Sequence, residues 1–249
     1  MESYQEKFSL SNDQMFDYES RIKKAKKAIS VIKDYLQDTK QCNVLDIGCS
    51  TGIMTNVYSE HFDKIIGIDI DKEAIKYASE NFKNKNLTFI EASFNDINIE
   101  KRRFDIITCS HIYEQVDDAQ ELLDTIYKLL KPGGICYFVA GNRYKIIEPQ
   151  FKLPFLSFLP NKLSKLYIRI AKKDGVYYQK HLSYFNLKKL VGMFTIHDYT
   201  IETIKNPSKY HSEELVIEGS LKQKATILIS KIVYFLIPTY IWILKKDVS

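Results

Sequence analysis

Short apolar runs alternate with helical patterns along the first 140 residues of the chain. Five runs have the length and composition of strands, at 43–47, 64–68, 87–90, 105–109 and 135–140. Between them, apolar side chains recur at helical spacing in 53–61, 72–82 and 119–130. Strands that are buried on both faces are apolar throughout, so this alternation predicts right-handed βαβ units and a parallel sheet covered by helices. The fold expected is a doubly wound α/β domain with a ligand site at the carboxyl ends of its strands.

The pattern differs at both ends of this region. Residues 16–36 predict an amphipathic N-terminal helix, whose basic residues are expected mostly on the solvent side: Arg21, Lys23, Lys24, Lys26 and Lys27. After residue 140 the alternation stops, and 141–184 is aromatic, basic and interrupted by prolines. A helix near 186–194 and a strand near 199–204 are then expected to resume the main pattern.

Composition narrows the class of protein. The apolar fraction of 45% and the charged fraction of 27% are ordinary for a globular domain. The four cysteines are far apart and form no C-x-x-C pair, so buried thiols are expected rather than a disulfide or metal framework. The first fifteen residues lack the apolar core of a secretory signal, and we expect a cytoplasmic protein. The net charge is +5, and residues 141–175 alone carry +6, so an anionic partner is expected there and nucleic acid is not.

The loop after the first predicted strand contains the residues that indicate a ligand site. Gly48 and Gly52 in "VLDIGCSTG" allow a tight strand-to-helix turn and a close approach of a ligand to the backbone. Asp46 lies at the end of a buried strand, where a carboxylate needs a partner, and Asp69 ends the next strand, where a doubly wound fold places an acid against ribose hydroxyls. The G-x-G-x-x-G loop of dinucleotide-binding folds is absent.

At these residues the chain resembles the class I S-adenosylmethionine-dependent methyltransferases. The motifs that carry the resemblance occur in the family's order between residues 44 and 139: "VLDIGCSTG", "IIGIDID", "LTFIEASFNDI", and "FDIITCSHIYEQV" followed by "LLKPGG". The resemblance implies one domain over 1–249, with an N-terminal cap helix (1–40), a cofactor-binding core (41–140), a helical lid insert (141–185) and a C-terminal helix and strands (186–249). It also implies a seven-stranded sheet of order 3-2-1-4-5-7-6 whose last strand is antiparallel.

That last strand bears on the apolar segment 225–244. The segment is long enough to cross a bilayer, but Lys231 and Pro238 interrupt it. We therefore favour a helix at 222–236 followed by the seventh strand at 239–246. Contact of the helix with a membrane surface stays open.

The resemblance also implies a cofactor, S-adenosylmethionine, with S-adenosylhomocysteine as product and no metal. Asp46 is expected to receive the cofactor's ammonium, and Asp69 to hold both ribose hydroxyls. The other residues expected to contact the cofactor are Gly48, Cys49, Ser50, Gly52, Ile70, Ser93, Phe94, Cys109 and Ser110. Ser50 departs from the family pattern, which has glycine there, and Ile70 and Phe94 could equally be core residues.

An alcohol acceptor needs a base, and two histidines have a suitable place. His111 follows the fourth strand, and His181 precedes the helix after the insert. Glu114 lies where relatives carry the Glu of a Glu-His pair, but Gln115 replaces the histidine.

The acceptor expected from the basic aromatic insert is a hydroxyl on a sugar, glycan or lipid-linked glycan, an amphiphilic and in some cases anionic small molecule. Two alternatives stay open: methylation of a quinone or other small aromatic compound, and a non-catalytic protein that binds S-adenosylmethionine. Peripheral membrane contact and a monomer or homodimer are compatible with the sequence.

Overall fold

The computed structural model describes residues 13–97, 103–148, 151–173, 177 and 179–248. Parts of the predicted N-terminal region and of the predicted insert, including Pro149, Asp174 and Gly175, lie outside the described residues.

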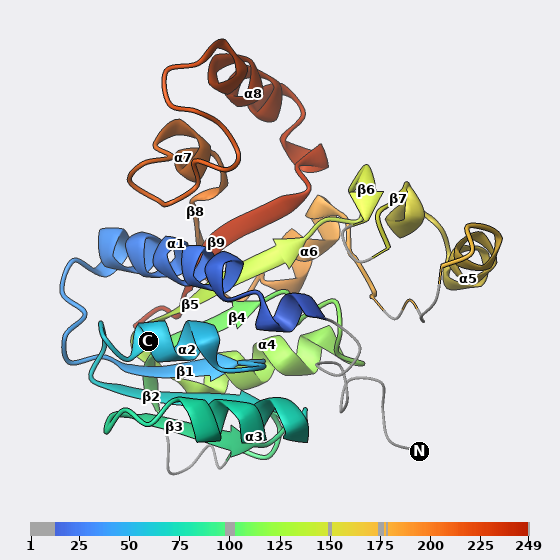
Figure 1. Ribbon diagram of the computed structural model, residues 1–249. Coiled ribbons are helices and arrows are strands. Elements are labelled where there is room, and N and C mark those ends of the chain that lie inside the picture. Colours follow the sequence, from blue (N-terminus) through green and yellow to red (C-terminus); the bar gives the residue numbers. More distant parts are fainter. Residues whose placement is uncertain (1–12, 98–102, 149–150, 174–176, 178, 249) are drawn as a thin grey trace.

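A seven-stranded sheet forms the centre of the molecule (Figure 1). Its order is β3-β2-β1-β4-β5-β9-β8, and β9 is antiparallel to both of its neighbours. The strands are β1 (Asn43–Ile47), β2 (Lys64–Asp69), β3 (Leu87–Glu91), β4 (Phe104–Ser110), β5 (Leu130–Gly141), β8 (Thr195–Asp198) and β9 (Thr239–Lys245). The predicted fold class and strand order are therefore confirmed.

Helices cover both faces of this sheet (Figure 1). Their bounds are α1 (Tyr18–Leu36), α2 (Ile53–Tyr58), α3 (Lys72–Asn81), α4 (Ala119–Leu129), α6 (Tyr184–Leu190) and α7 (Thr200–Lys205). Helix α8 (Leu221–Ile232) lies outside this layer and packs on α7. Neighbouring strand residues alternate between the two cores: Val44 packs with Ala28 and Ile32 of α1, whereas Leu45 packs with the cluster that contains Leu122 and Ile126 of α4. Because β1 pairs in parallel with both β2 and β4, the carboxyl ends of these strands lie at one edge of the sheet.

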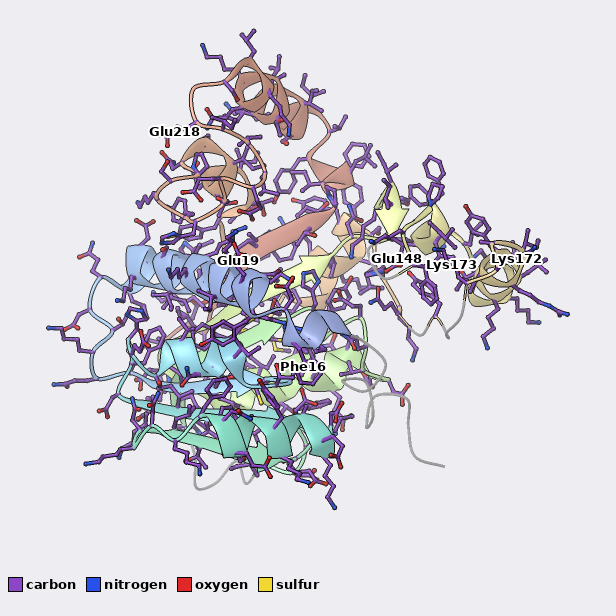
Figure 2. The ribbon with its side chains drawn as sticks, in the orientation of Figure 1. Phe16, Glu19, Glu148, Lys172, Lys173 and Glu218 are labelled. Carbon is purple, nitrogen blue, oxygen red and sulfur yellow. The ribbon has the colours of Figure 1, made fainter. Side chains whose placement is uncertain are left out.

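The insert forms a small layer of its own beside the sheet. A two-stranded hairpin of β6 (Ile147–Glu148) and β7 (Leu153–Pro154) leads into α5 (Asn161–Ile170), which lies beyond the hairpin from the sheet (Figure 1). Phe151, Leu153, Leu156, Ile168 and Tyr177 form its buried apolar cluster. Glu148 lies at the hairpin, whereas Lys172 and Lys173 lie next to α5, farther from the sheet (Figure 2).

One sequence prediction about the C-terminal part is wrong. Residues 199–204 were expected to be a strand, but Thr200–Lys205 form helix α7 and the strand precedes them as β8. The carboxylate of Asp198 accepts a hydrogen bond from the backbone N–H of Thr200 at 2.8 Å, which stabilises the start of the helix. An alternating six-residue pattern could not reveal this local cap.

The apolar segment 225–244 divides as expected. It contains most of α8, a short 3-10 turn at Tyr234–Leu236 and β9, which pairs with β5 from Ile135 to Gly141. In the described part of the chain, no helix is both long and apolar enough to cross a membrane.

Candidate active site

A cavity of about 490 Å³ opens at the carboxyl ends of β1, β2 and β4. The predicted cofactor residues that line it are Asp46, Gly48, Cys49, Ser50, Asp69, Ile70, Ser93, Phe94 and Ser110, and the predicted base His111 lines it as well. Among the described residues, those of the insert do not contribute to its wall. The parallel strands thus bring together side chains that are up to 65 positions apart in the sequence, from Asp46 to His111.

Asp46 is held rigidly at the end of β1. Its Oδ2 accepts a hydrogen bond from the Thr55 hydroxyl at 2.7 Å, and its Oδ1 accepts one from the Thr108 hydroxyl at 2.5 Å. The donors come from α2 and β4, so the carboxylate connects three elements beneath the loop. Each oxygen keeps a lone pair for a further donor.

Asp69 organises the loop from the neighbouring strand. Its Oδ2 accepts from the backbone N–H of Ser50 at 2.8 Å, and its Oδ1 accepts from the N–H of Asp71 at 2.9 Å. Ser50 has a φ of 50°, in the left-handed region that glycine adopts without strain. The position where the family has glycine therefore keeps the glycine conformation, and the bond to Asp69 helps to hold the serine in it.

Gly48 and Gly52 have no room for a side chain. Both have a positive φ, 74° and 73°. A Cβ on Gly48 would overlap the side chain of Ile112, and one on Gly52 would lie 2.6 Å from the Ala78 Cβ and the Phe89 ring. Gly48 lines the cavity, whereas Gly52 lies behind the loop and packs it onto α3 and β3.

The carboxylates of Asp46 and Asp69 make the cavity suited to a cationic ligand. Burial raises the pKa of Asp46 to about 6, and the nearby Asp69 adds to this, while the two hydroxyl donors and Arg21 act in the opposite direction. Burial also raises the pKa of Asp69, against the effect of its backbone donors. A sulfonium and an ammonium group, both cationic, would relieve this electrostatic cost, so the residues present fit S-adenosylmethionine.

Sequence reasoning missed Arg21, which was expected at the solvent. The side chain is half-buried and lines the cavity, and its Nε has no hydrogen-bond partner among the described residues. Burial lowers the pKa of Arg21, whereas Asp46 raises it. The signal was present in the helical spacing, because Arg21 lies four and seven positions before the buried Ala25 and Ala28. The other lysines of this run, apart from the half-buried Lys27, are exposed as expected.

The remaining predicted cofactor residues fall into two groups. Ile70, Ser93 and Phe94 border the cavity beyond β2 and β3, and the N–H of Ser93 donates to Asp96 at 2.8 Å. Cys109 instead is fully buried in the core behind Ser110 and does not reach the cavity wall. Met15 and Met54 also line the cavity, next to the Arg21 guanidinium, and no sequence pattern pointed to them.

His111 and Glu114 form a hydrogen-bonded pair just after the carboxyl end of β4. His111 has a φ of 59°, and its Nδ1 lies 2.9 Å from Oε1 of the buried Glu114. The pKa of Glu114 is lowered: burial raises it, but the charge and hydrogen bond of His111, followed by His181 and Lys145, outweigh burial. In the tautomer that carries its proton on Nδ1, the ring donates to Glu114, and Nε2 is the nitrogen whose lone pair can accept another proton.

His181 lies in the same polar cluster but behind the cavity. It is buried, its Nε2 lies 2.7 Å from the Gln179 side-chain oxygen, and it does not line the cavity wall. Burial, assisted by the Lys145 charge, lowers the pKa of His181 to about 4, while Glu114 acts in the opposite direction. His181 is therefore neutral at neutral pH.

The outer wall of the cavity carries further acids, Asp117, Asp118 and Glu121, in the turn and first helical turn after β4. Lys180, from the predicted insert, pairs with one of these acids: its Nζ lies 3.1 Å from Oδ1 of Asp117. In the described part of the chain, no cluster of three or more His, Cys, Asp or Glu side chains is arranged to hold a metal ion.

Known proteins share both the motif region and the fold. Residues 45–138 match the family model described as a methyltransferase domain. A ubiquinone biosynthesis O-methyltransferase of Coxiella burnetii is 27% identical over 182 residues, which cover 64% of this chain and 77% of the relative. The mitochondrial ubiquinone biosynthesis O-methyltransferase of Dictyostelium discoideum is 32% identical over 139 residues, which cover 51% of this chain and 40% of the relative.

A solved structure extends the likeness to nearly the whole fold. The plantazolicin methyltransferase BpumL, in complex with a substrate analogue and S-adenosylhomocysteine, superposes with a TM-score of 0.61 at 20% identity and covers 96% of this chain and 89% of its own. The cavity in the present structure lies at the edge of the sheet where Asp46 and Asp69 end their strands. Residues 45–138 are therefore a methyltransferase domain, and the chain as a whole has the fold of the class I S-adenosylmethionine-dependent methyltransferases.

Proposed function

We propose that this enzyme transfers a methyl group from S-adenosylmethionine to a hydroxyl group of a quinone or a related small aromatic compound. The observation that carries the proposal is that His111, hydrogen-bonded to the buried Glu114, lies on the wall of the same cavity as Asp46 and Asp69. The carboxylates that would bind the cationic cofactor and the candidate base His111 therefore line the same cavity.

The residues around the loop after β1 determine which way the cofactor would lie in the cavity. Asp46 receives the ammonium, directly or through water, and Arg21, with its unpartnered Nε, is placed for the carboxylate of the same methionine group. Asp69 accepts from the ribose hydroxyls, and Ile70, Ser93 and Phe94 border the adenine. The backbone of Gly48, Cys49, Ser50 and Gly52 passes beneath the methionine part, and Ser110, with Cys109 packed behind it, supports that side. The cofactor supplies a methyl group activated by the adjacent sulfonium.

The base completes the reaction. As the acceptor oxygen bonds to the methyl carbon and the carbon–sulfur bond breaks, the hydroxyl proton passes to Nε2 of His111. Glu114 holds the ring by its Nδ1 proton and stabilises the imidazolium that forms. Of the two predicted bases, this geometry favours His111, because His181 is behind the wall and its pKa of about 4 makes it a weak proton acceptor.

Two observations favour an aromatic acceptor over the sugar or glycan hydroxyl suggested by the insert. The two relatives compared above act in ubiquinone biosynthesis. The outer wall of the cavity carries two more acids, Asp118 and Glu121, beside the ion-paired Asp117, and these disfavour a phosphate-bearing acceptor by like-charge repulsion.

The test measures S-adenosylhomocysteine release with three acceptor classes: hydroxylated quinols and catechols, nucleotide sugars, and lipid-linked sugars. We expect turnover with the first class alone. Turnover with sugars alone would restore the glycan assignment. Cofactor binding without turnover on any of the acceptors would instead favour a non-catalytic binding protein.

A further inference from the structure

Helix α8 exposes a stripe of apolar side chains and buries two polar ones. A helix on the surface of a globular protein normally buries its apolar side and exposes its polar side. In α8 the polar Gln223 and Ser230 are buried. Four of its large apolar side chains are exposed: Leu221, Leu228, Ile229 and Ile232, of which Leu221 and Ile232 are 83% and 70% exposed. These four recur at helical spacing and form one exposed stripe, which we call the α8 face.

Helix α5 in the insert repeats this arrangement. Ser164 is fully buried, next to the buried Ile168. Leu163, Leu166 and Ile170 are each more than half exposed and lie three and four positions apart, so they form a second stripe, the α5 face. The exposed Phe155 precedes this helix. Figure 1 shows both helices at the periphery, outside the layers that cover the sheet.

Both faces are set in segments without acidic residues. Residues 151–173 contain six lysines and arginines and no aspartate or glutamate, and residues 219–246 contain five lysines and no acid. The exposed basic side chains on the two helices themselves are Lys162, Lys165 and Arg169 on α5, and Lys222, Lys224 and Lys231 on α8. Lys172 and Lys173 extend the charge beyond the C-terminal end of α5 (Figure 2).

We propose that the α5 and α8 faces bind the surface of an anionic lipid bilayer. An exposed apolar stripe beside lysines and arginines, with no acids, is what a helix needs to lie in the headgroup region of such a membrane. Pairing of two copies through these faces would place basic segments against each other, which like-charge repulsion opposes. The contact is peripheral, and it does not depend on which compound accepts the methyl group.

Vesicle binding by the full chain tests the proposal. Vesicles of phosphatidylcholine alone and vesicles with an equimolar share of phosphatidylglycerol are sedimented with the protein. We expect binding to the anionic vesicles, weaker binding at high salt, and little binding to the neutral ones. Absence of binding to the anionic vesicles, or equal binding to both, would overturn the proposal.

Variants of each helix locate the contact. Leu163→Ser, Leu166→Ser and Ile170→Ser together on α5, or Leu228→Ser, Ile229→Ser and Ile232→Ser together on α8, should each weaken binding by about tenfold or more. Because these side chains are exposed, the melting temperature and cofactor affinity should stay as in the wild type. Full binding by either variant would overturn the assignment of that helix.

A matched charge comparison separates a local contact from a general effect of net charge. Lys162→Gln, Lys165→Gln and Arg169→Gln together should weaken binding on the order of fivefold per residue. The control is Lys76→Gln, Lys83→Gln and Lys85→Gln, which removes the same charge from exposed positions on and after α3. An equal loss in the control would refute a local contact. A dimer in solution that the serine variants dissociate would refute the membrane in favour of self-association.

Discussion

Replacement of Asp46 by asparagine should stabilise the ligand-free enzyme at neutral pH while it weakens cofactor binding. The pKa of this carboxyl is about 6 because of burial, against an ordinary value of 3.8. A tenfold change in proton affinity corresponds to about 1.4 kcal/mol, so the ionised carboxylate costs the folded protein on the order of 3 kcal/mol above pH ~6. The asparagine carries no charge and avoids this cost.

The gain is reduced by lost hydrogen bonding. The amide oxygen can accept from one of the two hydroxyls, Thr55 or Thr108, and the second bond is worth about 1 kcal/mol. The net stabilisation expected at about pH 7.5 is therefore about 2 kcal/mol, or roughly 4–8 °C in melting temperature for a chain of this size. Since the folded state binds the Asp46 proton more tightly, wild-type stability contains a term that falls as pH rises from about 4 to about 6. The variant lacks this term, so its advantage should disappear below pH ~4.

Urea unfolding across this pH range measures the difference directly. Asp63→Asn is the matched control, because it removes one carboxylate from an exposed position and should give no comparable pH-dependent gain. Calorimetry with S-adenosylmethionine should show at least about tenfold weaker binding by the Asp46 variant, since the ammonium loses a charged partner. A variant that is less stable than the wild type at neutral pH, or a difference that does not change with pH, would refute the electrostatic argument.

Three further predictions concern the loop, the base and Arg21. Gly52→Ala should destabilise the protein by about 1–3 kcal/mol in urea unfolding, because it combines a φ of 73° with contacts of 2.6 Å to Ala78 and Phe89; an unchanged midpoint would contradict this packing. His111→Gln should lower kcat by about 10²–10⁴-fold with unchanged cofactor affinity, and Glu114→Gln should lower it less and alter its pH profile; normal turnover by His111→Gln would exclude this base. Arg21→Ala should weaken binding of S-adenosylmethionine about tenfold but leave adenosine binding unchanged, because the adenosine part does not contact it; equal losses for both would argue against a carboxylate contact.

The parts of the fold that sequence reasoning predicted well are those with long, uniform apolar patterns. β1, β2, β4 and β5 are buried on both faces, so their composition alone distinguishes them from the amphipathic helices α3 and α4. The insert was foreseen as helical and basic, but its hairpin has strands of only two residues each, too short for any periodicity.

The sequence predicted the site residues best where a residue type is costly at its position unless it has a function there. A carboxylate at a buried strand end, as at Asp46 or Asp69, is costly without a ligand or donors. Both were therefore predicted to bind the cofactor, and both line the cavity. Arg21 was missed because an arginine on an amphipathic helix is usually solvated. Glu114 was noted only as half of an incomplete Glu-His pair, since the backbone turn at His111 that makes the two side chains meet is not visible in the sequence.

The place of β9 in the sheet has a consequence for how the chain reaches this structure. β5 ends at Gly141, but its outer neighbour begins only at Thr239, so a fully apolar edge has no partner until that distant segment arrives. Such non-local pairing is expected to slow folding, and until it forms, the edge of β5 is open to pairing with strands of other chains. Recombinant expression at low temperature, or with chaperones that hold exposed strands, should therefore raise the yield of this enzyme more than changes to its surface would.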